Sequence, residues 1–170
     1  MIGLISDTHD NVENILKAVK VFKDRNVRFV LHLGDIIAPA TVPFFQGLSM
    51  KFITGNCDGD LANLKKIIHE QGWEYLGDIV KFSLGAYKCA AYHGQNRIKL
   101  DWMINSQEFN YVFHGHTHQK RDEIVGKTRV INPGAHYYTA EEKTVAIFDA
   151  QNNQVEFIEL GDKDGGMHIL

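Results

Sequence analysis

The sequence predicts an α/β domain in which two mixed sheets pack face to face with helices outside. Three observations support this prediction. In the first half of the chain, short apolar strands alternate with amphipathic helices, which is typical of parallel strands covered by helices. In the second half, a hairpin and several short strands dominate. The chain has 170 residues, enough for one hydrophobic core, and its apolar (44%) and charged (23%) fractions are those of globular proteins.

The first half of the chain predicts strands and helices in alternation. Short apolar runs, such as Met1 to Ser6, are typical of buried strands. Between them, apolar side chains recur at helical spacing, as in Val12, Ile15 and Val19. The predicted elements are, in order, strand 1–6, helix 12–25, strand 29–33, strand 52–54 and helix 61–71.

The second half of the chain predicts mostly strands. Gly85 and Ala86 separate two strand-like runs and indicate a hairpin, and the polar residues 151–154 indicate a turn. We expect one domain over residues 1–160 and a flexible, glycine-rich tail over 161–170. The predicted elements are strands 79–84 and 87–92, helix 98–105, and strands 111–113, 129–131, 144–148 and 155–160.

Charge and hydropathy argue against several classes of protein. The formal charge of −3 argues against a general nucleic-acid binder, which usually has a basic face. No apolar run approaches the roughly 20 residues that span a bilayer, and the N-terminus lacks the basic start of a signal peptide. Cys57 and Cys89 are too few for a disulfide framework. We therefore expect a cytoplasmic protein with free thiols and no membrane partner.

Polar residues cluster where five of the predicted strands end. Because parallel strands place their carboxyl ends along one edge of a sheet, these clusters are expected to converge on one pocket. A single Asp-x-His or His-x-His motif has little meaning by itself, but five clusters in this arrangement are not comfortably explained by chance. The clusters are Asp7-Thr8-His9, Gly34-Asp35, Gly55-Asn56-Cys57-Asp58, His93-Gly94 and Gly115-His116-Thr117-His118.

The residue types in these clusters predict a metal site. In Asp7-x-His9 and His116-x-His118, an extended chain would point both side chains of a pair the same way. Asp7 and Asp35 would repel each other at close range unless cations lay between them. Oxygen and imidazole ligands without a thiolate set suit Mn²⁺, Fe²⁺, Ni²⁺ or Zn²⁺ better than a structural zinc, with Mn²⁺ as first choice.

The order and spacing of the five clusters resemble the calcineurin-like metallophosphoesterase superfamily. The short length and the Gly55-Asn56-Cys57-Asp58 motif are most similar to its compact prokaryotic branch, the YfcE/MJ0936-type phosphodiesterases. The resemblance covers residues 1 to 160 and implies a four-layer α/β/β/α sandwich. It also implies two divalent metal ions per chain, bridged by Asp35. The implied ligands are Asp7, His9, Asp35 and His118 for one metal, and Asp35, Asn56, His93 and His116 for the other.

Two such cations would lower the pKa of a shared water from about 15.7 toward 7, and the hydroxide formed would attack phosphorus in line. The leaving alkoxide then needs a proton. Cys57, or a water ordered by Asp58, is the candidate donor, although Cys57 could equally pack beside the metals. The family often has a catalytic His at the position of Cys57, so the identity of the general acid stays open.

The expected substrate contacts are Asn11, Asn56 and His136. Asn11 could instead be the N-cap of the first helix, which its position favours slightly. We expect His32 to be buried with its hydrogen bonds satisfied, although it could also support a ligand, and we expect His114 to be structural.

The chain is thus expected to be a phosphodiesterase for a small or nucleotide-like substrate, and a homodimer or higher oligomer is compatible with the sequence. A metal-binding scaffold like the retromer subunit of this superfamily, or a nuclease, is the alternative. All seven ligand types are present, which disfavours the scaffold. The acidic chain has little room for the segments with which nucleases grip nucleic acid.

Overall fold

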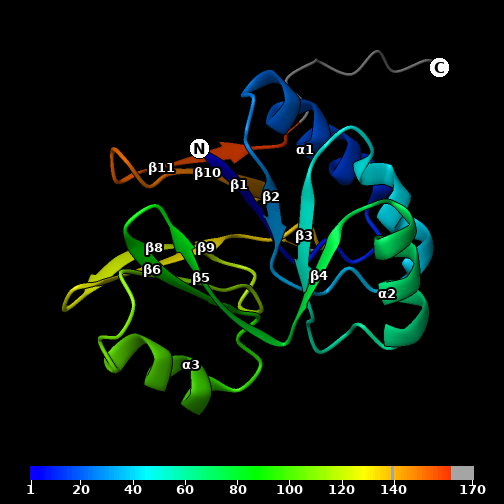
Figure 1. Ribbon diagram of the computed structural model, residues 1–170. Helices are drawn as coiled ribbons and strands as arrows, with labels where there is room; N and C mark the ends of the chain where they lie inside the picture. Colours follow the sequence, from blue (N-terminus) through cyan, green and yellow to red (C-terminus); the bar gives the residue numbers. More distant parts are fainter. Residues whose placement is uncertain (139, 162–170) are drawn as a thin grey trace.

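The computed structural model describes residues 1–138 and 140–161, and it confirms the predicted α/β class with two mixed sheets and helices outside (Figure 1). The first sheet has the strand order β11-β10-β1-β2-β3-β4. Within it, β1 to β4 run parallel, and β10 and β11 are antiparallel additions at one side. Its strands are β1 (Ile2–Ile5), β2 (Val30–His32), β3 (Met50–Ile53), β4 (Glu74–Gly77), β10 (Thr144–Asp149) and β11 (Gln154–Glu159).

The second sheet has the strand order β5-β6-β7-β9-β8. Its central strands β6, β7 and β9 run parallel, and the edge strands β5 and β8 are antiparallel to their neighbours. The carboxyl ends of the parallel strands therefore lie at one edge of this sheet. Its strands are β5 (Ile79–Leu84), β6 (Tyr87–Tyr92), β7 (Tyr111–Phe113), β8 (Lys120–Val125) and β9 (Thr128–Pro133).

Three helices and one 3₁₀ helix complete the layers. α1, α2 and the 3₁₀ helix η1 pack on the outer face of the first sheet, and α3 packs on the second sheet (Figure 1). α1, α2 and α3 all begin at an Asn or Asp whose side chain accepts a hydrogen bond from a backbone N–H three residues on. Their bounds are α1 (Val12–Asp24), η1 (Pro39–Phe45), α2 (Leu61–Glu70) and α3 (Arg97–Asn105).

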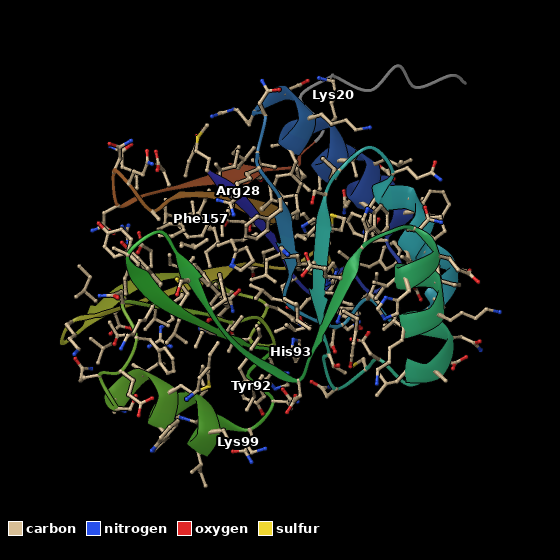
Figure 2. All side chains as sticks on the ribbon, in the orientation of Figure 1. Lys20, Arg28, Tyr92, His93, Lys99 and Phe157 are labelled. Atoms are coloured by element: carbon tan, nitrogen blue, oxygen red, sulfur yellow. The ribbon has the colours of Figure 1, made fainter. Side chains whose placement is uncertain are left out.

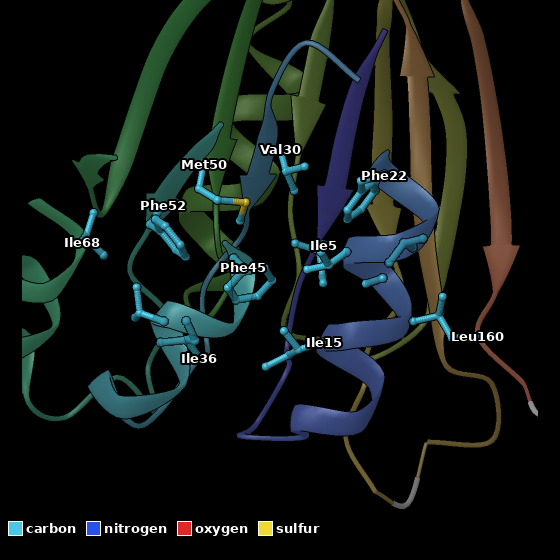
Figure 3. Packing of buried hydrophobic residues seen from close by; sticks show 14 of the residues in the cluster. Ile5, Ile15, Phe22, Val30, Ile36, Phe45, Met50, Phe52, Ile68 and Leu160 are labelled. Carbon is cyan, nitrogen blue, oxygen red and sulfur yellow. The ribbon is translucent and has the colours of Figure 1, made fainter. Parts of the chain in front are cut away.

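The period of two along each strand divides the core into layers. In β1, Leu4 packs between the two sheets, whereas Ile5 faces the helices. Figure 3 shows Ile15 and Phe22 projecting from α1 toward Ile5. Burying each such side chain stabilises the fold by about 1.5–3 kcal/mol relative to exposure. The same alternation separates Val112, which packs under α3, from the residues between the sheets.

Two strands, β4 and β8, and the 3₁₀ helix η1 were not predicted from the sequence. β8 carries four charged residues in its first four positions and lies at an edge, where charge protects a strand from pairing but hides its period. β4 is also an edge strand, and η1 contains two prolines. Of the predicted flexible tail, residues 162–170 lie outside the described residues. Within residues 1–138 and 140–161, no helix is long and apolar enough to cross a membrane.

Candidate metal centre

The predicted ligand clusters follow the carboxyl ends of parallel strands in both sheets. They follow β1, β2 and β3 in the first sheet and β6 and β7 in the second. His93, directly after β6, reaches across to the first sheet, where its Nδ1 lies 2.7 Å from the carbonyl oxygen of Leu33. Figure 2 labels both residues: His93 lies toward the first sheet, whereas its neighbour Tyr92 lies toward α3. The two sheets therefore bring their clusters to one place, as predicted.

The carboxylates of Asp7 and Asp35 form the centre of the site, and both residues are buried. Asp7 Oδ2 accepts hydrogen bonds from the Ser6 hydroxyl and from the backbone N–H of His116, the latter at 3.0 Å. Asp35 Oδ1 accepts a hydrogen bond from the backbone N–H of Cys57 at 2.8 Å. Each carboxylate is thus held to the protein through one oxygen. The other oxygens, Asp7 Oδ1 and Asp35 Oδ2, lie near the imidazoles.

Three imidazoles surround these free oxygens. His93 Nδ1 donates its proton to a backbone carbonyl, so Nε2 presents a lone pair, as metal-binding histidines do. His93 Nε2 lies 3.4 Å from Asp35 Oδ2 and 3.9 Å from Asp7 Oδ1. His9 Nε2 lies 3.6 Å from Asp35 Oδ2, and His118 Nε2 lies 3.2 Å from Asp7 Oδ1. Oxygen and nitrogen donors therefore point at a common space.

The donor atoms of this cluster fit a divalent cation. Among the described residues, Asp7 Oδ1, His9 Nε2 and His93 Nε2 are buried and have no hydrogen-bond partner. Unpaired buried polar atoms are costly, and a cation at this place would satisfy all three. Carboxylate and imidazole are also the ligands that first-row divalent metals accept. Ligand atoms lie within 4.8 Å of one another in the groups Asp7/His9/His118, Asp7/Asp35/His93 and His9/Asp35/Cys57.

The two histidines of the His116-x-His118 motif lie on different sides of the cluster. The ring of His118 is 5.4 Å from that of His9, whereas the ring of His116 is 5.2 Å from that of His93. Asn56 is exposed, and its side-chain amide donates a hydrogen bond of 3.3 Å to Cys57 Sγ. The roles of His116 and Asn56 as ligands of a second metal stay predictions.

The backbone at the ligands differs from the extended chain that we expected. Five ligand positions have a positive φ, which is uncommon for residues other than glycine. The side chains therefore converge through left-handed turns directly after the strands, and not through strand alternation. Strained backbone of this kind is characteristic of functional sites. The φ angles are 53° for Asp7, 44° for His9, 59° for Asp35, 67° for His116 and 58° for His118.

Asp58 holds the turn that carries Asp35. Its buried carboxylate accepts hydrogen bonds from the backbone N–H groups of Asp35 (3.1 Å), Ile36 (2.8 Å), Ile37 (2.9 Å) and Gly55 (2.8 Å). With both oxygens committed in this way, Asp58 is not placed to order a catalytic water, and that expectation is corrected. Asp58 instead fixes the loops after β2 and β3 against each other.

Glycine is required where these loops meet most closely. A Cβ atom at Gly55 would collide with the carboxylate and backbone nitrogen of Asp35, and one at Gly115 would collide with the Ser6 hydroxyl. These are rigid parts of the site, so no side chain can be accommodated there without moving a ligand. The two glycines therefore allow the loops of the two sheets to approach the carboxylates.

The charges of the cluster support one another in the absence of a metal. Burial raises the pKa of Asp7, but the nearby imidazoles of His118 and His93 outweigh burial and hold this pKa below its usual 3.8. Burial also raises the pKa of Asp35, but the interaction of its carboxylate with the His93 imidazole outweighs burial, so this pKa is lowered. The pKa of His118 is raised, chiefly by its close contact with the Asp7 carboxylate. Both carboxylates are thus ionised at neutral pH and available to a cation.

The structure corrects two of the expected substrate contacts. Asn11 is the N-cap of α1: its side-chain oxygen accepts from the N–H of Asn14, and its amide donates to the carbonyl of His136. His136 is fully buried and its Nε2 bonds the carbonyl of Thr144 at 3.0 Å. Both residues therefore lie beneath the cluster. The neighbouring Tyr137, which the sequence analysis did not select, contacts the cluster from the solvent side.

Two other supporting residues were also missed. Ser6 bonds Asp7 directly, and Asp10 ties the first loop to the second by accepting hydrogen bonds from the N–H of Ala38 (2.9 Å) and the hydroxyl of Thr41 (3.0 Å). Their only sequence signal is their position within two or three residues of a predicted ligand. Short polar side chains in turns have many uses, so that signal does not separate support from coincidence.

The histidines below the cluster are neutral. His32 is buried: its Nδ1 accepts from the N–H of Gly34, its Nε2 pairs with the Thr8 hydroxyl, and burial lowers its pKa to about 3. Burial also lowers the pKa of His114 to about 4. His32 is therefore satisfied, as expected, and sits directly beneath two ligand loops. His114 is buried and its Nδ1 lies 3.0 Å from the carbonyl oxygen of Gly115, so the structural role expected for it stays a prediction.

Cys57 lies at the rim of the cluster, and both cysteines are free thiols, as predicted. The pKa of Cys57 is raised to about 11, by burial first and then by the carboxylates of Asp35, Asp58 and Asp7. The thiol therefore keeps its proton at neutral pH while no cation is nearby. Its two interpretations, proton donor or packing residue, remain open at this point.

Two sheets sandwiched between helices, with a carboxylate–imidazole cluster at the strand ends, define the class of metallophosphoesterases. A calcineurin-like phosphoesterase superfamily domain matches residues 1–153. The chain therefore belongs to the calcineurin-like phosphoesterase superfamily, a metal-dependent family of hydrolases that act on phosphoester bonds. This confirms the resemblance inferred from the five clusters and the enzyme class.

Individual proteins agree with this assignment. The chain is 33% identical to the phosphodiesterase MJ0936 of Methanocaldococcus jannaschii over 163 residues, which cover 94% of this chain and 98% of the relative. A solved structure of an archaeal phosphodiesterase is 31% identical with a TM-score of 0.88, over 93% of this chain and 98% of the other. The structure of YfcE, a phosphoesterase from E. coli, is 15% identical with a TM-score of 0.72, over 94% and 99%, and shows the shared fold only.

Proposed function

We propose that this chain is a dinuclear metal-dependent phosphodiesterase that hydrolyses a small or nucleotide-like phosphodiester. The observation that supports the proposal most directly is the convergence of three buried atoms without a partner, Asp7 Oδ1, His9 Nε2 and His93 Nε2. The likeness to MJ0936, which is named a phosphodiesterase, favours a diester over a monoester. Mn²⁺ is the first choice of metal, with Ni²⁺, Fe²⁺ and Zn²⁺ compatible with the same ligands.

In this proposal, the ligands divide between two cations. Asp35 is shared, because its free oxygen lies near both His9 and His93. When bound, two divalent cations supply an activated water and neutralise the charge on the phosphate. The remaining ligands would be Asp7, His9 and His118 on one side, and Asn56, His93 and His116 on the other.

The chain itself contributes orientation and a proton. Backbone N–H groups and Ser6 hold one oxygen of each central carboxylate, so the other oxygen needs no rearrangement to bind a cation. Cys57 lies beside Asp35 at the exposed rim, where a leaving group would depart. We infer that its thiol donates a proton to the leaving oxygen, since a cysteine thiol, with an ordinary pKa of about 8.5, can serve as an acid at neutral pH.

The first test is hydrolysis of bis-p-nitrophenyl phosphate by protein stripped with a chelator and then titrated with Mn²⁺, Ni²⁺ and Zn²⁺. Metal content is measured in parallel, and p-nitrophenyl phosphate serves as the matched monoester. We expect turnover of the diester to return as two metals bind per chain and to exceed that of the monoester.

The hydrolysis experiment, together with a measurement of oligonucleotide binding, separates the alternatives. Two bound metals without hydrolysis of either ester would favour a scaffold that has kept its metals. Hydrolysis with a single bound metal would contradict the dinuclear centre. Affinity for an oligonucleotide that falls steeply with salt would indicate a nuclease, because phosphate contacts release counterions.

A further inference from the structure

Two hollows open beside the metal cluster, one on each side of residues 117–120. The first has a volume of about 520 Å³ and is lined by His118 and Tyr137. The second has a volume of about 540 Å³ and is lined by His116, Arg97 and Arg121. Each hollow therefore begins at one histidine of the His116-x-His118 motif. A phosphate group bound at the cluster would have space for an organic substituent on either side.

The hollow next to His118 has an aromatic wall. The ring of Tyr137 lies 4.9 Å from the ring of His9 and 5.5 Å from that of His118, and the residue is 38% exposed. One part of the Tyr137 ring is thus held against two predicted ligands of one metal, and another part faces solvent. The cation of this hollow, Lys120, is paired with Glu142. The hollow therefore offers an aromatic surface with no unpaired cation beside it.

The hollow next to His116 has a different chemistry. Its lining contains two guanidinium groups, Arg97 paired with Asp101 and Arg121 paired with Glu123, and no Tyr, Phe or Trp side chain. Aromatic groups bind in edge-to-face or offset contact with other rings, with centroids about 4.5–7 Å apart. The hollow at His118 should therefore accept an aromatic substituent of a diester better than the hollow at His116 does.

We propose that Tyr137 forms a subsite for an aromatic ester group, such as an aryl or nucleobase-bearing substituent, of the phosphodiester bound at the metal cluster. The proposal rests on the phosphodiesterase function proposed above. Tyr137 acts here on binding and specificity, not on bond cleavage. Its neighbour Tyr138 has a similar side chain in the same loop, is 68% exposed and does not line the hollow. It is therefore a matched control.

The test uses two phosphonates that cannot be hydrolysed, phenylphosphonate and methylphosphonate, titrated calorimetrically into the Mn²⁺-loaded protein. We expect phenylphosphonate to bind roughly two- to tenfold more tightly, which is the range of one ring–ring contact. Tyr137→Phe should keep this ratio, and Tyr137→Ala should bring it close to one. Tyr138→Ala should behave like the wild type. The Kd of methylphosphonate should stay constant in all variants, which shows that the cluster is intact.

Equal affinity of the wild type for the two phosphonates would overturn the subsite, as would an unchanged ratio in Tyr137→Ala. If neither phosphonate binds but bis-p-nitrophenyl phosphate is hydrolysed, the subsite is wrong and the phosphodiesterase proposal stands. If phenylphosphonate is preferred but no diester is hydrolysed, the subsite stands and the hydrolytic proposal fails. The two proposals can therefore fail separately.

Discussion

The two sheets contribute unlike halves to the metal cluster. The half from the first sheet contains the carboxylates of Asp7 and Asp35, both buried. Within it, Asp58 joins the loops after β2 and β3 by four backbone hydrogen bonds. The half from the second sheet contains the imidazoles of His93, His116 and His118. His93 is fully buried, but His118 lies on a more open loop, with 34% of its side chain accessible.

This difference shows how such a site divides its tasks. Carboxylates repel each other, so they have to be fixed before a metal binds, and the backbone N–H groups of the first half provide this. Imidazoles bind a metal in their neutral form and then do not repel one another, so they need less restraint, and a partly open loop lets substrate reach the centre. We therefore expect a change at Asp35 to affect both metals and a change at the open loop to affect one.

The largest expected effect is that of Asp35→Asn. This change removes the charge that both metals would share, so hydrolysis of bis-p-nitrophenyl phosphate should fall by more than roughly a thousandfold. The protein without metal should stay folded but lose some stability, because the lowered pKa of Asp35 shows that its charge, beside His93, stabilises the folded state at neutral pH. Thermal unfolding in chelator measures this second effect.

His118→Ala provides the matching change in the other half. It removes a ligand of one side only, so metal analysis should find one cation per chain, whereas Asp35→Asn should bind none tightly. Full activity of Asp35→Asn, or equal metal content in the two variants, would break the comparison between the halves.

Cys57→Ala removes the exposed member of the first half. If the thiol protonates the leaving oxygen, the loss should be about a hundredfold or more for a diester with an alkoxide leaving group and small for one with nitrophenolate. Cys57→Ser keeps the size of the side chain but is a much weaker acid, and it should follow the alanine variant. Equal losses with both leaving groups would leave Cys57 as a packing residue.

Asp58→Asn tests whether the hydrogen bonds of Asp58 hold the ligand loops of the first half in place. Asn keeps one acceptor oxygen, so two of the four backbone N–H groups lose their partner, at a cost of about 1–3 kcal/mol each. Metal affinity, measured by competition with a chelator, should fall about 10- to 100-fold, as for other residues that orient ligands. The control is Asp60→Asn, an exposed helix cap that keeps its capping oxygen. Unchanged metal affinity in Asp58→Asn would show that the loop turns are held by other means.

The sequence predicted the metal ligands of both halves better than the residues that hold these ligands in place. Short apolar runs ending in Asp, His and Gly are visible in one sequence, so the class of fold and the cluster could be predicted. The left-handed turns at Asp7 and His116 could not, because an Asp-x-His motif also fits an extended chain. Asp58 acts through backbone N–H groups of a loop distant in the sequence, and no local pattern encodes that contact. Ser6 bonds the side chain of its neighbour Asp7, but a serine beside an aspartate is too common to predict this contact.

Tyr137 and His136 illustrate the same limit. Adjacent residues at a strand end face opposite sides, and which one faces the cluster depends on the register of β9 and on the loop after it. A pattern of residue types cannot tell which of the two side chains faces the cluster. The edge strand β8 was missed for a related reason, since its charged side chains follow solvent exposure and not the core.

The smallest expected effect concerns the histidine below the first half. His32 stays neutral down to about pH 3 in the folded protein, whereas an unfolded His takes up a proton near pH 6.5. The unfolded state therefore binds more protons between these values, and stability falls as the pH drops through 6.5. For one such group the loss between neutral pH and pH 5 is about 2 kcal/mol.

Denaturant unfolding in chelator at pH 7 and pH 5 measures this loss. His32→Gln should reduce the difference in unfolding free energy between the two pH values by about 2 kcal/mol, whatever its effect at neutral pH. The exposed His69→Gln serves as control and should keep the wild-type difference. His93 has the opposite effect on the pH dependence of stability, because its pKa is raised. Burial lowers this pKa, but the interactions with Asp35 and Asp7 outweigh burial. The stability that this pairing adds is present below pH 6.5 and is lost as the pH rises through the raised pKa. A wild-type pH dependence in His32→Gln would mean that the first half is not supported by a neutral histidine.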